Sequence, residues 1–283
     1  MARIEFDQLL ELYRHAKFGK GGEEDESQVT VATPAIAALL MRVETDDYAA
    51  AETGITLLDD VKAVKDGVVV SVRLNDPRSG FAVLARDVDG LVRSPAARIE
   101  EPRHFYLVAP AYAPGDEPFP DEVARYRQTL AVIQLFARAA SMLDATKSEL
   151  VFVKDGKMVM PIRFNAGDLK ALDTVAADRL LGQFADELHD EQKCSILFEA
   201  LVDLCSAHRS ESRFRFALRN MGDLANRVAQ GYRLFASGFS YAKVRSELED
   251  ARIDYTQKIH KTIVDIQNQL LGIPSRRSSS RRR

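Results

Sequence analysis

The stretch ELVFVKDGKMVMPIRF, residues 149–164, carries the clearest strand pattern of this chain. β-Branched and aromatic residues flank Asp155-Gly156, which suits a hairpin because both central positions of a tight turn need a positive φ. Pro161 cannot donate a backbone hydrogen bond, so its strand is expected at the edge of a sheet. No strand pattern follows Phe164. The sequence therefore predicts an α+β fold, with an N-terminal antiparallel sheet and its packing helices followed by an all-helical part.

Residues 60–110 carry further strand patterns, in the runs VKAVKDGVVVSVRL, FAVLARDVDGLVRS and HFYLVAP. Asp66-Gly67 and Asp89-Gly90 suit tight turns, so this region is expected to form an antiparallel meander. The words VKDG…VRLN at 64–75 and VKDG…IRFN at 153–165 repeat at an offset of 89 to 90 residues. An ancient duplication and simple turn chemistry both explain this repeat.

Two helices are expected beside these strands. The first lies within residues 4–17, before a loop at 19–28, and the second runs from a capping Asp121 to about Leu143. The steps of three and four residues between its apolar positions hold one face of the second helix against a core. These positions are Val123, Tyr126, Leu130, Ile133, Ala137 and Ala140. The helices and strands together make a predicted first domain, residues 1–165.

The second predicted domain, residues 166–274, is helical. Residues 171–188 and 190–208 are expected to form helices, and two longer segments at 212–236 and 241–271 carry heptad-like apolar seams. Gly238 is expected to end the first of these and Ser240 to cap the second, which predicts a long antiparallel αα-hairpin. The seams consist of Phe214, Leu218, Met221, Ala225, Val228, Tyr232 and Phe235, then Tyr241, Val244, Leu248, Ala251, Tyr255, Ile259, Ile263, Ile266 and Leu270.

The far end of the second long helix is the predicted partner-binding site. At about 1.5 Å per residue, the segment 241–271 outruns 212–236 by roughly 9 Å. The shorter helix therefore leaves Ile263, Ile266, Leu270 and Leu271 uncovered, and burying a large aliphatic side chain is worth roughly 1.5–3 kcal/mol. Four occupants are open: the chain's own helices within 168–207, a second copy of the chain, a helix of another protein, and a bilayer surface.

The Ser/Arg segment 275–283 is predicted to be a disordered tail. Its basic residues are Arg276, Arg277, Arg281, Arg282 and Arg283, so residues 1–274 carry a net charge of −8 against −3 for the whole chain. An acidic body repels phosphate polymers, and any nucleic-acid or anionic-surface binding is expected through these arginines. A solvated tail without a binding role is the alternative.

Residues 232–274, YRLFASGFSYAKVRSELEDARIDYTQKIHKTIVDIQNQLLGIP, resemble a stretch of uncharacterised bacterial proteins. In those proteins a long helix leads into C-terminal membrane-spanning helices after an Ile-Pro pair. The resemblance covers 43 of 283 residues, includes no catalytic motif, and implies a membrane-linked system such as a phage-defence or mobile-element module. This chain departs from the pattern after Ile273-Pro274, where Ser and Arg replace the apolar span, which puts membrane insertion in doubt.

Cysteine usage and the first thirty residues indicate a cytoplasmic protein, with peripheral membrane contact left open. Two cysteines provide no disulfide framework, and charges interrupt the N-terminal segment where a signal peptide would be apolar. Cys194 and Cys205 lie eleven residues apart on one expected helix, about 16 Å along its axis, so with His189 and His208 they cannot surround one zinc ion. No metal and no cofactor is expected.

Catalytic motifs are weak. The pairs Asp46-Asp47 and Asp59-Asp60 have the residue type of nuclease metal ligands, but neighbouring strand residues point to opposite faces. The sequence favours a non-catalytic bacterial interaction or assembly protein that self-associates or binds another protein through its C-terminal helices. A nucleic-acid-binding protein acting through the tail and a hydrolase or nuclease with carboxylate ligands are the alternatives.

Overall fold

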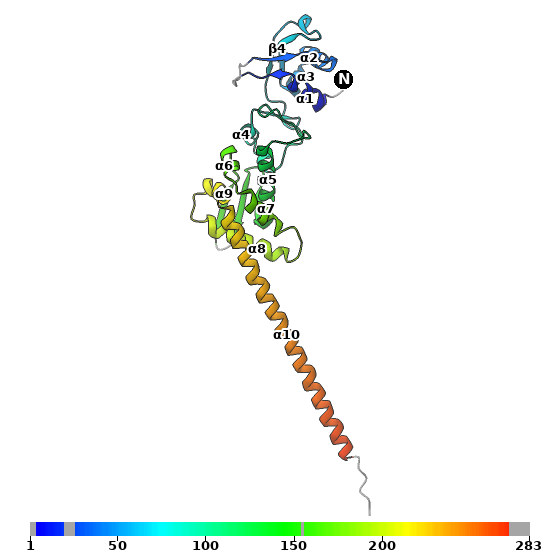
Figure 1. Ribbon diagram of the computed structural model, residues 1–283, viewed down its shortest axis with the longest axis vertical. Coiled ribbons are helices and arrows are strands. Elements are labelled where there is room, and N and C mark those ends of the chain that lie inside the picture. Colours follow the sequence, from blue (N-terminus) through cyan, green and yellow to red (C-terminus); the bar gives the residue numbers. More distant parts are fainter. Residues whose placement is uncertain (1–3, 20–25, 154–155, 272–283) are drawn as a thin grey trace, which may run out of the picture. The chain divides into compact units, whose positions relative to one another are not determined.

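The computed structural model describes residues 4–19, 26–153 and 156–271 (Figure 1). It has 56% helix and 14% strand, with an antiparallel sheet near the N-terminus and a helical C-terminal part, which confirms the predicted α+β class. Contacts divide the chain into two units, Met1–Ala229 and Gln230–Arg283. The first unit contains all the strands of the described chain, and each unit is treated below by itself.

The N-terminal sheet is antiparallel throughout, with strand order β1-β2-β4-β3. Its helices begin at capping side chains: the Thr33 hydroxyl accepts a hydrogen bond from the Ile36 amide, and Asp46 accepts from Tyr48 and Ala49. Sheet and helices enclose one hydrophobic cluster that includes Leu9, Leu40 and Val70. The elements are α1 (Phe6–Arg14), β1 (Ala16–Lys17), β2 (Glu26–Thr30), α2 (Pro34–Thr45), α3 (Asp47–Thr53), β3 (Ile55–Leu57), the 3₁₀ turn η1 (Val61–Ala63) and β4 (Val69–Leu74).

The predicted meander at 60–110 is wrong. Strand β4 pairs with β2 and β3 instead of folding back on η1, and β5 (Val83–Ala85) pairs with β6 (Phe105–Leu107) in parallel. Asp89-Gly90 lies inside the short helix α4 (Val88–Leu91), because the Asp87 carboxylate accepts a hydrogen bond from the Gly90 amide at 2.8 Å and so starts a helical turn. A second 3₁₀ turn, η2 (Ala96–Arg98), follows. The first VKDG word does not form a hairpin, which favours turn chemistry over duplication.

The hairpin predicted at 149–164 is confirmed. Strands β8 (Glu149–Val153) and β9 (Lys157–Pro161) pair antiparallel, and β7 (Met142–Asp144) completes a three-stranded sheet in the order β7-β8-β9. Pro161 therefore lies on an edge strand, as expected. The helix predicted at 121–143 is α5 (Asp121–Ala139); Pro120 is its N-cap residue in place of Asp121, and it ends early because the chain turns into β7.

Four helices pack around this sheet and α5: α6 (Ala166–Ala171), α7 (Thr174–Gly182), α8 (Asp190–Cys205) and α9 (Ser210–Arg219). The second hydrophobic cluster joins them to residues from both sides of position 165, among them Phe136, Phe152 and Phe214. The division predicted at 165 is thus spanned by one core and stays a prediction. Asp168 is fully buried; its carboxylate accepts from Arg219 at 2.8 Å and lies 3.3 Å from Arg215.

The predicted long αα-hairpin is wrong. The chain breaks after α9 at Asn220, whose side-chain amide donates to the Phe216 carbonyl, and then forms one continuous helix, α10 (Met221–Leu271), through Gly238. A glycine inside a helix destabilises it by only about 1 kcal/mol relative to alanine, which is too little to end a helix of this length. The apolar seam that begins at Phe214 faces the chain's own core: Phe214, Leu218, Met221, Ala225 and Val228 are buried.

Candidate functional site

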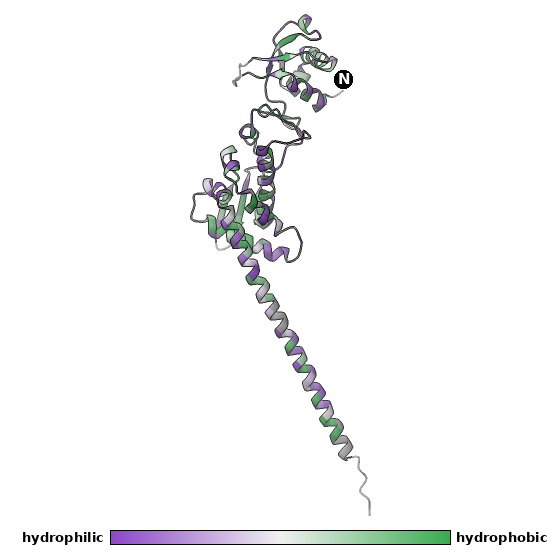
Figure 2. Ribbon diagram, viewed as in Figure 1, coloured by the Kyte–Doolittle hydropathy of each residue, from purple (hydrophilic) through white to green (hydrophobic). Residues whose placement is uncertain are grey.

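The part of α10 that belongs to the second unit, from Gln230 onward, exposes an unusual amount of apolar surface. Figure 2 shows hydrophobic residues recurring along this helix between hydrophilic ones. Ile263 is 47% exposed and Ile266 51% exposed, whereas the large apolar residues at the start of α10, such as Leu224, are buried. Leu270 and Leu271 end the helix, and their side chains lie outside the described part of the chain.

Six of these residues lie along one side of the helix, and we call them the distal stripe. At about 100° per residue, all six fall within about 80° of arc. They are Tyr241 (72% exposed), Leu248 (66%), Tyr255 (69%), Ile259 (59%), Ile263 and Ile266. Ile253 (56% exposed) and Val264 (48%) lie on the opposite side of the helix. An aromatic row lies on that same side, nearer the start of the helix. It consists of Tyr232, Phe235 and Phe239, whose successive ring centroids are 6.2 and 6.1 Å apart.

The distal stripe is longer than the predicted partner site. Sequence reasoning assigned Tyr241, Leu248, Tyr255 and Ile259 to the seam of a hairpin and therefore to burial. The structure leaves them exposed because α9 ends at Arg219 and no sister helix runs beside this segment in the described chain. The signal that could have found them was Asn220, a residue that favours helix ends, ahead of the weaker break at Gly238.

Charged residues lie beside the distal stripe and, at Arg245 and Arg252, within its arc, and all are exposed. Arg245 and Glu249 form an ion pair at 3.2 Å, and Asp254 and Lys258 form another at 3.2 Å, each between residues four apart. Exposed pairs of this spacing contribute only about 0.3–0.5 kcal/mol to a helix. The ion pairs therefore do not replace the apolar partner that the stripe lacks.

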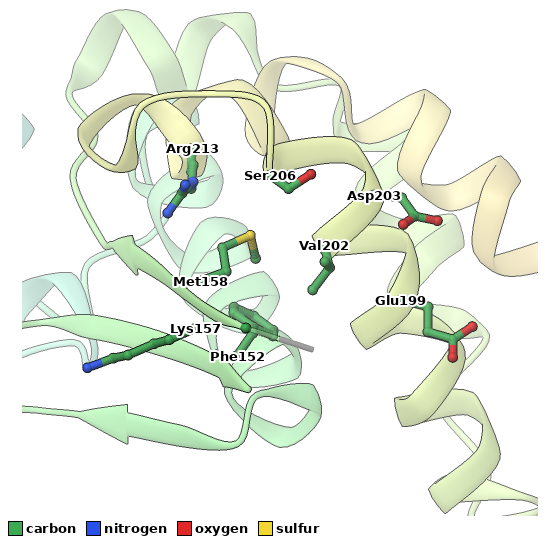
Figure 3. Close-up of a pocket in the computed structure, with 9 residues that line it drawn as sticks. Phe152, Lys157, Met158, Glu199, Val202, Asp203, Ser206 and Arg213 are labelled. Atoms are coloured by element: carbon green, nitrogen blue, oxygen red, sulfur yellow. The ribbon is translucent and has the colours of Figure 1, made fainter. Parts of the chain in front are cut away.

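A cavity of about 410 Å³ lies between the β8–β9 hairpin and α8 (Figure 3). Phe152, Met158 and Val202 face one another across it, while Glu199 and Asp203 extend away from this apolar group. Arg213 lies at its rim and uses two of its donors in backbone contacts: Nη1 donates to the Val159 carbonyl at 2.6 Å and Nε to the His208 carbonyl at 3.0 Å. This arrangement is that of a packing gap with a structural arginine.

A larger cavity of about 1030 Å³ is lined by segments 4–6, 79–83 and 94–104. Two of its polar side chains are held in structural contacts. His104 stacks on Phe6 with ring centroids 4.7 Å apart, and Glu101 accepts a bidentate pair of hydrogen bonds from Arg127. These two groups therefore brace the walls of the cavity.

Three of the four carboxylates singled out in the sequence accept hydrogen bonds from backbone amides, and two of them cap helical turns. Asp46 caps α3, Asp60 accepts from the Lys62 amide at 2.8 Å, and Asp59 accepts from the Ser71 amide at 2.6 Å. Their oxygens satisfy backbone donors, and they lie on separate turns. Across the described residues, no three His, Cys, Asp or Glu side chains gather closely enough to hold a metal ion.

The cysteine and histidine set is also dispersed. Cys194 and Cys205 lie on α8, the Cys205 thiol donates to the Arg213 carbonyl at 3.8 Å, and His208 stacks on Phe216 with centroids 3.7 Å apart. Burial raises the pKa of Cys205 to about 12, and partial burial raises the pKa of Cys194. Both thiols are therefore protonated at neutral pH.

These thiols should differ in reactivity. At pH 7.5 we expect Cys194, which is half-buried, to react slowly with a disulfide reagent, and the buried Cys205 to react more than about a hundredfold more slowly, because only the thiolate attacks. Labelling followed by peptide mass spectrometry measures both rates, and Cys194→Ser provides the control. Equal rates in the folded protein would contradict the burial described for Cys205.

The arginines of the tail, Arg276, Arg277, Arg281, Arg282 and Arg283, lie outside the described residues. Among the described helices, none has the length and apolar composition needed to cross a membrane. A comparison with protein-family models, curated proteins and solved structures returns no match to this chain. The exposed face of α10 is therefore the feature on which a functional proposal can be built.

Proposed function

We propose that this chain is a non-catalytic assembly protein that joins a second copy of itself through the distal stripe of α10. The observation that carries the proposal is the exposure of six large apolar side chains on one side of a helix. Surface helices of globular proteins place such a stripe against a core. A stripe of this kind with nothing over it marks a binding surface.

Helix stability supports the same conclusion. Isolated helices are marginal in water even when their sequences favour them, and most helical stability in proteins comes from packing an apolar face. Within residues 230–271, the exposed ion pairs between residues four apart stabilise the helix only weakly, and the apolar stripe is exposed instead of packed. Covering each large apolar side chain contributes roughly 1.5–3 kcal/mol. Pairing with another helix therefore supplies what this segment lacks.

A second copy fits the surface because the segment carries charges of both signs. The residues around the stripe include exposed Glu247, Glu249 and Asp254 and exposed Lys258 and Lys261. A surface with both an acidic and a basic stretch can be complementary to itself, as the symmetric interface of a homodimer must be. A strongly one-signed helix would repel its own copy.

Solution mass tests this proposal. The 31.6 kDa chain is expected to scatter light with twice that mass at tens of micromolar. Ile259→Glu places a charge in the stripe of both copies and should raise the dissociation constant at least a hundredfold, because each 1.4 kcal/mol is a factor of ten. Circular dichroism should show a parallel loss of helix as residues 230–271 lose their partner.

Ile253→Glu is the matched control. Ile253 has the same side chain, a similar exposure and the same helix, but lies off the stripe, so this variant should keep the dimeric mass. The thermal transition of the first unit should be the same in both variants, since neither residue contacts its core. A monomeric mass for the unaltered chain, or equal dissociation by the two variants, would refute the proposal.

A further inference from the structure

We infer that the two copies of α10 pair antiparallel, with the two-fold axis at Tyr255. This inference rests on the self-association proposed above and adds the orientation and register of the pair. Two features carry it: the reversal of charge along the helix and the charged residues beside the stripe.

The charge along the helix reverses sign at Tyr255. Residues 246–254 contain Glu247, Glu249, Asp250 and Asp254 against Arg252 alone, a net charge of −3, and the nine residues 256–264 contain Lys258 and Lys261, a net charge of +2 with His260 neutral. All the side chains of 246–264 are exposed. An antiparallel pair centred at Tyr255 lays each acidic segment on a basic one, whereas a parallel pair lays like charges together.

The residues beside the stripe give the same orientation. In an antiparallel helix pair, each flank of one stripe meets the same flank of the other. Asp254 and Lys258 share one flank, and centring at Tyr255 places Lys258 of one copy about 3 Å along the axis from Asp254 of the other. Glu249 and His260 share the second flank, with an axial offset of about 1.5 Å between copies. A parallel pair would instead bring Glu247 of one copy beside Glu249 of the other.

The axis also falls near the middle of the distal stripe. From Tyr241 to Ile266 the stripe residues recur at multiples of about 3.6 residues, so the stripe runs straight along the helix, and its midpoint falls within two residues of Tyr255. Antiparallel pairing at this register places Ala251 opposite Ile259 and Leu248 opposite Thr262. At these two positions a large residue faces a smaller one, while the two Tyr255 residues meet on the axis and Ile263 falls opposite Glu247.

The arrangement fixes the spacing of the two arms. Both helices rise about 1.5 Å per residue, in opposite directions from Tyr255. The axial distance between a residue and its copy therefore grows by about 3 Å with each step away from Tyr255 along the chain. The two Gln230 residues, where the second unit begins, are then about 75 Å apart. A parallel pair would hold them side by side.

Spin-label distances test the orientation. Single cysteines replace Ser237 or Gln257, both exposed, in the full chain with Cys194→Ser and Cys205→Ala, and pulsed electron resonance measures the distance between copies. Antiparallel pairing predicts an axial separation of about 54 Å for labels at Ser237 and about 6 Å at Gln257. The measured distance should therefore at least double between the two positions.

The outcomes separate the two proposals. A dimeric mass with the same short distance at both positions means parallel pairing and overturns the orientation while leaving self-association in place. A dimeric mass with a long distance at Ser237 and a short one at Gln257 supports both. A monomeric mass in the doubly substituted background and in the unaltered chain overturns the proposed function, and the orientation with it.

Discussion

Phe214→Ala is expected to lower the free energy of unfolding of the first unit by about 3–5 kcal/mol. The Phe214 ring is fully buried, meets Phe136 edge-on with centroids 6.4 Å apart, and lies 5.8 Å from the ring of Phe164. Removing it opens a cavity where α5, α9 and the segment after β9 meet, and close-packed interiors relax only partly around such a loss. Urea unfolding followed by circular dichroism measures the change.

Phe216→Ala is the control for this prediction. Phe216 lies two residues further along the same helix, is half-buried, and stacks on His208. Its loss should reduce the free energy of unfolding by only about 1 kcal/mol, because truncating a half-exposed ring removes less buried area. If the two variants unfold at the same urea concentration, α9 does not pack through Phe214 as described.

Asp168→Ala is expected to lower the free energy of unfolding by about 2–4 kcal/mol. The carboxylate is fully buried and serves three donors: Arg219, Arg215 and the Asn165 amide, with which it closes the capping box of α6. Both arginines are partly exposed, so water can solvate their guanidinium groups once the carboxylate is removed. We therefore expect a loss in the lower half of this range.

Asp173→Ala separates the capping contribution from the ionic one. Asp173 caps α7 through the Ala176 amide at 3.0 Å, and replacing an N-cap residue with alanine costs about 1 kcal/mol. Asp168→Asn keeps the cap geometry and removes the charge, and should fall between the two. Denaturant unfolding at pH 7 ranks the three variants, and an Asp168→Ala loss no larger than that of Asp173→Ala would show that the arginines contribute nothing.

Local patterns in this sequence predicted structure well where a segment settles its own conformation. The hairpin at 149–164 and helix α5 follow from alternation, a turn and a period of three to four residues, all within about twenty residues. Asp-Gly at 89–90 failed because its outcome depends on Asp87, which caps a helical turn as readily as a tight turn reverses a strand. The parallel pairing of β5 with β6 depends on segments twenty residues apart, which no local pattern records.

The candidate site was likewise only partly predictable from the sequence. The sequence identified apolar residues at the end of the last helix, and the structure places Ile263 and Ile266 there in exposed positions. It could not show that the seam from Phe214 to Val228 faces the core while the stripe from Tyr241 onward faces outward, because both have the same period. The change from buried to exposed positions falls after Val228 within the single helix α10, where no residue that ends a helix marks it.

The edge strand β9 is protected against pairing with a strand of another molecule. Exposed sheet edges template the addition of strands from other molecules. Here Pro161 has no amide hydrogen to offer, and the carbonyl of Val159 accepts a hydrogen bond from the Arg213 guanidinium. A foreign strand would have to displace Arg213 to reach that carbonyl, so amyloid-like growth from this edge is disfavoured and Arg213→Ala would open it.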